Sequence, residues 1–132
     1  MKSLSCFLFV FALLATTSIS ARPPIASYGT DISPHDHLNT KGEPLATVKD
    51  ILKQDRSNYY HHKGDLKDQP DTYFSNEMHR NSFENAHIRI NPALAKQIKE
   101  NKNKDVLITV FVVTPNEIDV EPGLPKKTAE KK

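Results

Sequence analysis

The apolar residues between positions 44 and 55 recur at helical spacing. One face of a helix drawn through this segment carries Leu45, Val48, Ile51 and Leu52. Pro44 suits the first helical position, where its missing N–H needs no acceptor. The pattern therefore predicts a helix over 44–55. Because so short a helix is marginal alone in water, its apolar stripe needs a partner.

A strand pattern and a second helix pattern follow one another in the C-terminal half. Residues 86–90 (AHIRI) alternate between apolar and polar side chains, as in a strand with one buried face. Asn91 is a favourable helix N-cap, and Pro92 is a favourable first helical residue. We therefore expect a strand over 86–90 and a helix over 92–101.

The strongest strand signal in the chain is the run VLITVFVV at 106–113. Its β-branched residues predict a strand over 105–113, and Pro115 ends it. Because both faces of this strand are apolar apart from Thr109, we expect a central strand that is covered on both faces. Left uncovered, the same run is an aggregation hazard.

Together these elements predict a small single domain of the α+β class, spanning 44–120. The strand, helix and strand can form a tight right-handed βαβ unit. They can also form a split arrangement with a further strand, for which 117–120 is the candidate, between them. The helix over 44–55 is the expected cover for the sheet.

Three segments lack a regular pattern. Residues 22–43 contain scattered prolines and glycines, which predict a flexible, disordered N-terminal arm. Residues 56–81 are interpreted as a long polar loop with a short helical turn near 74–80. Such a loop is unusual inside a compact domain, so either it is functional or the domain begins after it. Residues 121–132 predict a disordered Lys-rich tail.

Residues 1–21 have the three-part pattern of a secretory signal peptide. Lys2 gives a positive start, 6–15 form an apolar core, and 16–21 are small residues. The apolar core is about ten residues long, whereas a membrane-spanning helix needs about 20. Cleavage is expected after Ser20 or after Ala21. The mature protein is therefore predicted to be secreted and extracellular.

Composition narrows the classes of function. The one cysteine, Cys6, lies in the predicted leader, so a cysteine-free mature chain has neither disulfides nor zinc–thiolate sites. The chain has 18 basic and 16 acidic residues, a balance that predicts no binding to nucleic acid or to anionic membranes. It contains no N-glycosylation sequon and, after the leader, no apolar run of membrane-spanning length. We expect a soluble, non-glycosylated product.

Sequence motifs for catalysis are missing. The chain has no G-x-S-x-G motif, and its 4 glycines are not spaced to hold a phosphate. Carboxylate pairs such as Glu77 and Glu84 occur, but so small a chain can hardly enclose the pocket that acid–base catalysis needs. We therefore expect no enzymatic activity and no cofactor.

Histidines give the main hint of a metal. His35 and His37 fall on one side of an extended segment, a common start of a Zn²⁺ or Cu²⁺ site. Further donors lie nearby in the sequence: Asp36, His61, His62 and Asp65. Solvated loop histidines have the same appearance, so no metal ligand is assigned. An extracellular Zn²⁺- or Cu²⁺-binding protein is kept as one alternative.

An aromatic cluster in the polar loop suggests a recognition surface. It consists of Tyr59, Tyr60, His61 and His62. Aromatic side chains are favoured as interface anchors, although a thin core also needs its few aromatics. We expect a small secreted protein that binds an extracellular protein partner through these four residues. Self-association through the apolar strand is left open.

A precursor of a secreted bioactive peptide, or a defence effector, is the other alternative. Such precursors are cut at dibasic sites, and after the leader the first such pair is Lys126–Lys127, preceded by Pro125 instead of Gly. The chain also lacks a cationic amphipathic helix, the usual feature of a membrane-active peptide. A binding protein stays intact and unfolds cooperatively, whereas a precursor appears as fragments.

Overall fold

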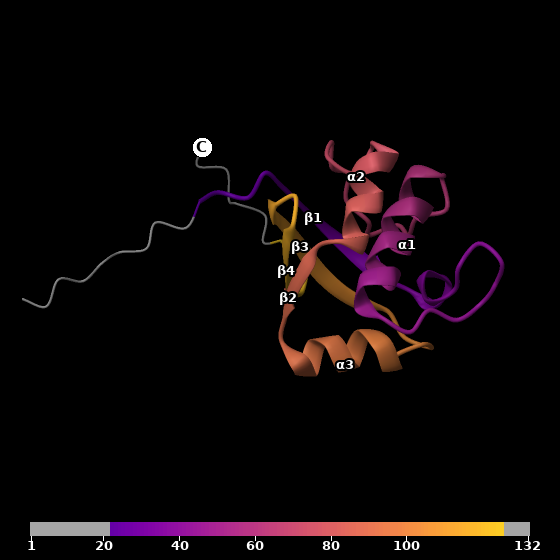
Figure 1. Ribbon diagram of the computed structural model, residues 1–132. Coiled ribbons are helices and arrows are strands. Elements are labelled where there is room, and N and C mark those ends of the chain that lie inside the picture. Colours follow the sequence, from indigo (N-terminus) through magenta and orange to yellow (C-terminus); the bar gives the residue numbers. More distant parts are fainter. Residues whose placement is uncertain (1–21, 126–132) are drawn as a thin grey trace, which may run out of the picture.

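A computed structural model of the chain describes residues 22–125 (Figure 1). The signal-peptide prediction, with cleavage at Ser20 or Ala21, and the tail beyond Pro125 lie outside the described residues. In chain order the elements are β1 (Ala26–Ile32), the 3-10 turn η1 (Pro34–His37), α1 (Val48–Tyr60), α2 (Glu77–Asn81), η2 (Ser82–Glu84), β2 (His87–Ile90), α3 (Pro92–Glu100), β3 (Val106–Thr114) and β4 (Glu117–Pro122). The predicted α+β class is confirmed.

The strands form one sheet in the order β1-β3-β4-β2. β3 is antiparallel to β1 on one side and to β4 on the other, and β4 is parallel to β2. β4 therefore lies between β3 and β2, as in the split alternative. Because β2 and β3 consequently run in opposite directions, the unit is not a parallel βαβ crossover.

The helices lie on one side of the sheet (Figure 1). Alternate residues of β3 point to that side and are buried: Val106, Ile108, Val110 and Val112. The helices and connecting segments contribute the other half of the core: Ile51, Leu52, Phe74, Phe83, Leu94 and Ile98. This alternation follows from the two-residue period of a strand.

The opposite face of β3 is less covered than the sequence predicts. Leu107, Phe111 and Val113 are half-buried there, and among the described residues no helix packs over them. The Thr109 hydroxyl donates a hydrogen bond to the Gly123 carbonyl at 2.7 Å. Residues 121–125, assigned to the disordered tail by the sequence, are thus part of the ordered domain.

The prediction of a flexible arm over 22–43 is wrong for most of this segment. It contains β1, which pairs with β3 over its full length, and the turn η1. Tyr28, Thr30 and Ile32 face the core, while Gly29 and Asp31 interrupt the apolar pattern of the strand. The strand is held by long-range pairing and burial, which single-strand propensity does not report.

Helix α1 begins and ends later than predicted. Thr47, not Pro44, precedes its first turn, and the Thr47 hydroxyl accepts a hydrogen bond from the Asp50 N–H at 3.1 Å. The helix continues past 55 to Tyr60. The buried residues of this last part are Asp55, Arg56 and Asn58, so the inward stripe changes from apolar to polar side chains.

The remaining predictions agree more closely with the structure. The polar segment 56–81 contains the end of α1 and then α2, near the predicted turn at 74–80. Asn91 caps α3 by accepting a hydrogen bond from the Ala93 N–H at 2.8 Å, and Pro92 is the first helical residue. Among residues 22–125, no helix has the length and apolarity needed to cross a membrane.

Candidate functional site

The C-terminal half of α1 is built around a fully buried arginine. The Arg56 guanidinium donates to Asp55 Oδ2 at 3.2 Å, to Asp71 Oδ2 at 3.0 Å and to the Gln69 carbonyl at 2.9 Å. It also lies over the Tyr28 ring, 3.8 Å from Cζ to the ring centre, and over the Tyr59 ring at 4.6 Å. These residues are called the Arg56 cluster.

The Arg56 cluster is coupled electrostatically. Burial raises the pKa of Asp55 well above its ordinary value, and the adjacent Arg56 charge opposes that shift. The Thr30 hydroxyl, from β1, donates to Asp55 Oδ1 at 2.7 Å. The cluster thus ties α1 to β1 and to the segment around Asp71, with the buried charges paired.

The chain after α1 returns along the outer side of β1. The Gln69 N–H donates to the Gly29 carbonyl at 2.8 Å, and the Gly29 N–H donates to Gln69 Oε1 at 2.9 Å. The Asp31 N–H donates to Asp68 Oδ1 at 2.9 Å. Residues 62–69, here called the α1 loop, are therefore tied to β1 at their C-terminal end.

Helix α1 ends in a Schellman motif. The Lys63 N–H donates to the Asn58 carbonyl at 2.8 Å and the His62 N–H to the Tyr59 carbonyl at 3.2 Å. His62 has φ of 60°, a left-handed conformation that glycine normally supplies at this position. A histidine in this place carries local backbone strain and presents its imidazole to solvent.

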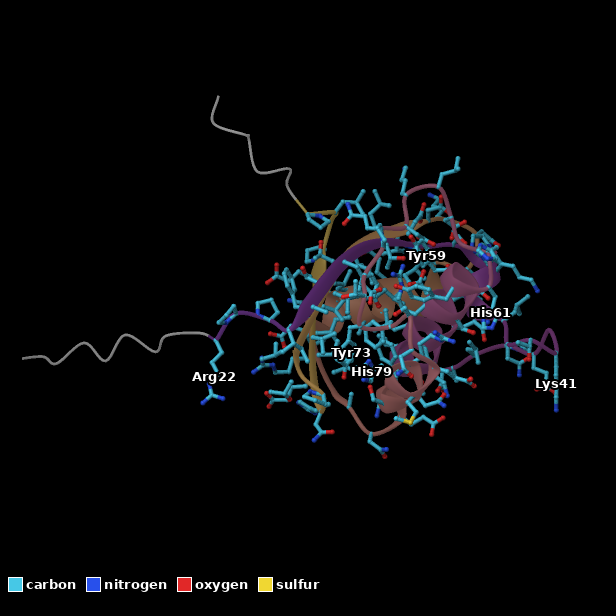
Figure 2. All side chains as sticks on the ribbon, turned by 90° about the horizontal axis from the view of Figure 1, so that it is seen from above. Arg22, Lys41, Tyr59, His61, Tyr73 and His79 are labelled. Atoms are coloured by element: carbon cyan, nitrogen blue, oxygen red, sulfur yellow. The ribbon has the colours of Figure 1, made fainter. Side chains whose placement is uncertain are left out.

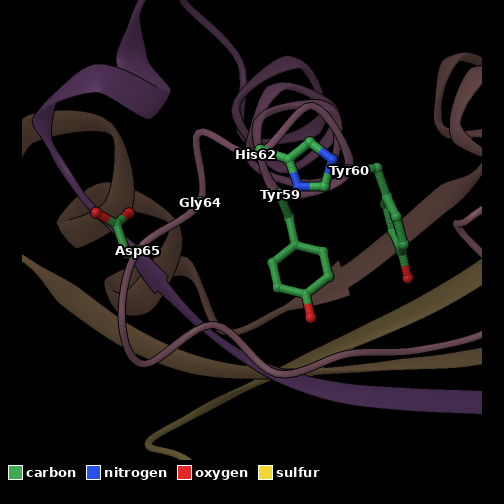
Figure 3. A pocket seen from close by; sticks show the side chains of 5 residues that line it. All are labelled: Tyr59, Tyr60, His62, Gly64 and Asp65. Atoms are coloured by element: carbon green, nitrogen blue, oxygen red, sulfur yellow. The ribbon is translucent and has the colours of Figure 1, made fainter.

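A hollow of about 430 Å³ lies beside this helix end (Figure 3). It is lined by Tyr59, Tyr60, His62, Gly64 and Asp65. The Tyr59 and Tyr60 rings meet edge to face, with ring centres 5.0 Å apart. The α1 loop passes the hollow and carries Leu66, whose side chain is fully exposed.

The four predicted partner-binding residues divide into two pairs. Tyr59 and Tyr60 are partly buried: Tyr59 packs on Arg56, and the Tyr60 hydroxyl bonds to Asp71. His61 and His62 are exposed, and His61 points outward at the end of α1 (Figure 2). The two tyrosines are therefore part of the fold as well as of the hollow.

The histidine pair His35 and His37 does not form one site. His37 is buried, with its ring nitrogens 3.1 Å from the Ser33 carbonyl and 2.7 Å from the Ile98 carbonyl. His35 lies beside two carboxylates, with Nε2 at 3.6 Å from Asp36 Oδ1 and 3.8 Å from Asp65 Oδ2. Both aspartates are close to histidines in the sequence, but their convergence on His35 depends on the α1 loop.

The Arg56 cluster was not predicted, because Arg56 and Asp71 fall in a segment interpreted as a polar loop. The available signal was helical spacing: Asp55 and Arg56 follow Ile51 and Leu52 by four residues and occupy the same face.

Comparisons with protein-family models, with curated proteins and with solved structures found no match for this chain.

Proposed function

We propose that this is a small, soluble, non-enzymatic protein that is secreted and binds another protein outside the cell. The leader-like pattern of residues 1–21 supports secretion. The balanced charge favours a protein partner over nucleic acid or an anionic membrane. The proposed contact surface consists of His61, His62 and Leu66 around the hollow lined by Tyr59 and Tyr60.

One observation carries the proposal: a fully exposed leucine stands beside an aromatic-lined hollow on a loop with fixed ends. Side chains that bind proteins tightly are apolar or aromatic, and they act best when they are already ordered. The backbone bonds of Gln69 and Lys63 supply that order on either side of Leu66. Binding there would require little rearrangement of the free protein.

Tyr59 and Tyr60 are unsuitable targets for a test, since their loss also removes contacts to Arg56 and Asp71. Leu66 and Met78 are better positions for substitution, because both side chains are apolar and exposed, at 106% and 74% relative exposure. Met78 lies on α2, outside the proposed surface, and is the matched control.

The experiment places a photo-crosslinking residue at position 66 or at position 78 of the secreted chain. Each protein is irradiated in extracellular fluid from the producing organism. We expect a protein adduct of one defined mass from position 66. Excess wild-type protein and Met78→Ser should compete with its formation, and Leu66→Ser should not. Equal adducts from both positions, or an adduct that wild type does not displace, would contradict the proposed surface.

A further inference from the structure

His35, Asp36 and Asp65 bring three potential metal-ligand atoms together from two separate segments. Each residue offers one ligand atom, and the three atoms all lie within 4.8 Å of one another. His35 Nε2 lies 3.6 Å from Asp36 Oδ1 and 3.8 Å from Asp65 Oδ2. The Lys63 carbonyl oxygen is a fourth potential metal ligand and lies 3.0 Å from His35 Nε2. A tetrahedral Zn²⁺ site with bonds of about 2.0–2.2 Å has its ligand atoms about 3.3–3.6 Å apart. The observed separations of 3.6 and 3.8 Å are close to that range.

The second observation is an unsatisfied atom. Asp65 Oδ2 is buried and, among the described residues, has no hydrogen-bond donor within reach. A buried carboxylate oxygen without a donor is costly, and native structures normally satisfy such atoms with a donor, a water or a cation. Here the atom faces the Nε2 side of His35.

The charge around the cluster also favours a cation. The Asp36 side chain is 1% exposed, and the Asp65 carboxylate lies beside it, so two acidic groups meet in a place partly shielded from water. His35 is the basic side chain within ion-pair distance of both carboxylates.

Surrounding groups already orient these ligands. Asp36 accepts hydrogen bonds from the Ser33 N–H at 2.9 Å and from Asn58 Nδ2 at 2.8 Å. The Ser33 hydroxyl lies 2.9 Å from His35 Nδ1 and 3.3 Å from Asp36 Oδ2. Metal-binding histidines usually donate their second ring N–H to such a partner, which leaves the other nitrogen free to bind.

We propose that His35 Nε2, Asp36 Oδ1, Asp65 Oδ2 and the Lys63 carbonyl bind one divalent metal ion of the Zn²⁺ type. On binding, the His35 proton moves from Nε2 to Nδ1, where Ser33 Oγ accepts it as a hydrogen bond. The Ser33 hydroxyl then donates to Asp36 Oδ2. One imidazole with carboxylates suits Zn²⁺, and His35 lines a second hollow through which the ion and its water can enter.

The ion would join η1 to the α1 loop. His35 and Asp36 belong to η1, whereas Lys63 and Asp65 belong to the loop that carries Leu66. The two proposed sites share the α1 loop, since Asp65 also lines the hollow, but metal binding can be tested with the metal alone and without a protein partner.

The test is calorimetric titration of the purified full-length secreted chain with Zn²⁺ after treatment with chelator. We expect one saturable site per chain and a melting temperature that rises with Zn²⁺ concentration. Asp65→Asn and His35→Gln should each weaken binding at least tenfold. The double variant His61→Gln/His62→Gln is the control and should bind within twofold of wild type.

Asp65→Asn is the deciding variant, because Asp65 Oδ2 holds no hydrogen bond in the described structure and its neutralisation should leave the fold intact. Folding is checked by the melting temperature of each variant in chelator. Absence of a one-to-one site in wild type would overturn the proposal. So would a folded Asp65→Asn protein with wild-type affinity, or loss of the site in the His61/His62 control.

Discussion

At the scale of single residues, His62 shows how a helix end can be built against backbone preference. It occupies the left-handed position of a Schellman motif with φ of 60°. Non-glycine residues in this conformation cost roughly 1 kcal/mol relative to glycine. The cost is retained next to the hollow that we propose as the partner surface.

We therefore expect His62→Gly to raise the free energy of unfolding by about 0.5–1 kcal/mol. His61→Gly is the matched control: His61 has φ of −98°, so glycine relieves no strain there and lowers stability. Urea unfolding measures both. Equal effects of the two substitutions would contradict the assignment of backbone strain to the left-handed conformation of His62.

Asp31 is a second residue that lowers stability, because its carboxyl group is buried. Its side chain is buried, and Oδ1 has no donor among the described residues. Burial, together with the charges of Asp105 and Asp65, raises the pKa of Asp31 to about 6. The folded chain therefore keeps a proton that the unfolded chain releases near pH 3.8. The stabilisation is complete below that pH and is lost as the pH rises through about 6.

Asp31→Asn should remove this pH-dependent loss of stability. We expect the variant to be more stable than wild type by about 1–2 kcal/mol at pH 8, and to show a smaller decline in stability between pH 4 and pH 7. Chemical unfolding across this range, with chelator present to exclude metal effects, measures it. Parallel pH profiles for the two proteins would contradict the assignment to Asp31.

At the scale of elements, α1 depends on charges that lie inside the domain. Removing Arg56 leaves Asp55 and Asp71 buried without their counter-charge, because its guanidinium contacts both. We expect Arg56→Met to cost about 3–5 kcal/mol of unfolding free energy. Lys53→Met on the same helix removes a solvent-exposed pair with Glu84 and should cost much less stability, because water screens that pair.

Urea unfolding of the Arg56 and Lys53 variants gives the comparison directly. A loss for Arg56→Met no larger than that for Lys53→Met would mean that the buried carboxylates are neutral or hydrated in the folded protein. Restoration of stability by adding Asp71→Asn to Arg56→Met would identify the uncompensated carboxylate as the cause.

The same helix explains what the sequence could predict. Apolar periodicity identifies a helix through Ile51 and Leu52, and the Asn91-Pro92 pair places the start of α3 correctly. Periodicity fails at Arg56, where a charged residue continues the buried face. A pattern of apolar residues cannot register a core position filled by paired charges, so 56–81 appeared to be a loop.

At the scale of the whole molecule, the sheet order could not be obtained from local patterns. β1 is recognisable only from its pairing with β3. In that pairing Ala26 lies opposite Val112 at one end, and Ile32 lies opposite Val106 at the other. For the same reason the candidate sites were only partly predictable. Tyr59 to His62 are neighbours in the chain, whereas Asp36 and Asp65 meet through the return of the α1 loop.

The intact mass of the natural product tests the proposed secretion and processing of the whole chain. Because the described residues share one hydrophobic core, we expect a single species comprising 21–132 or 22–132 that unfolds in one cooperative transition. A set of shorter fragments would contradict a binding protein and support a peptide precursor. A product that retains residues 1–21 would contradict the predicted leader.

The α1 loop also has a consequence for the integrity of the sheet. Gln69 and Asp68 occupy hydrogen-bonding groups on the outer side of β1 that would otherwise be open to another chain. An unoccupied strand edge is a template for pairing with a foreign strand. Cleavage of the loop at Leu66 by a protease would therefore free these groups of β1 and leave the edge of the sheet open to pairing with a strand of another chain.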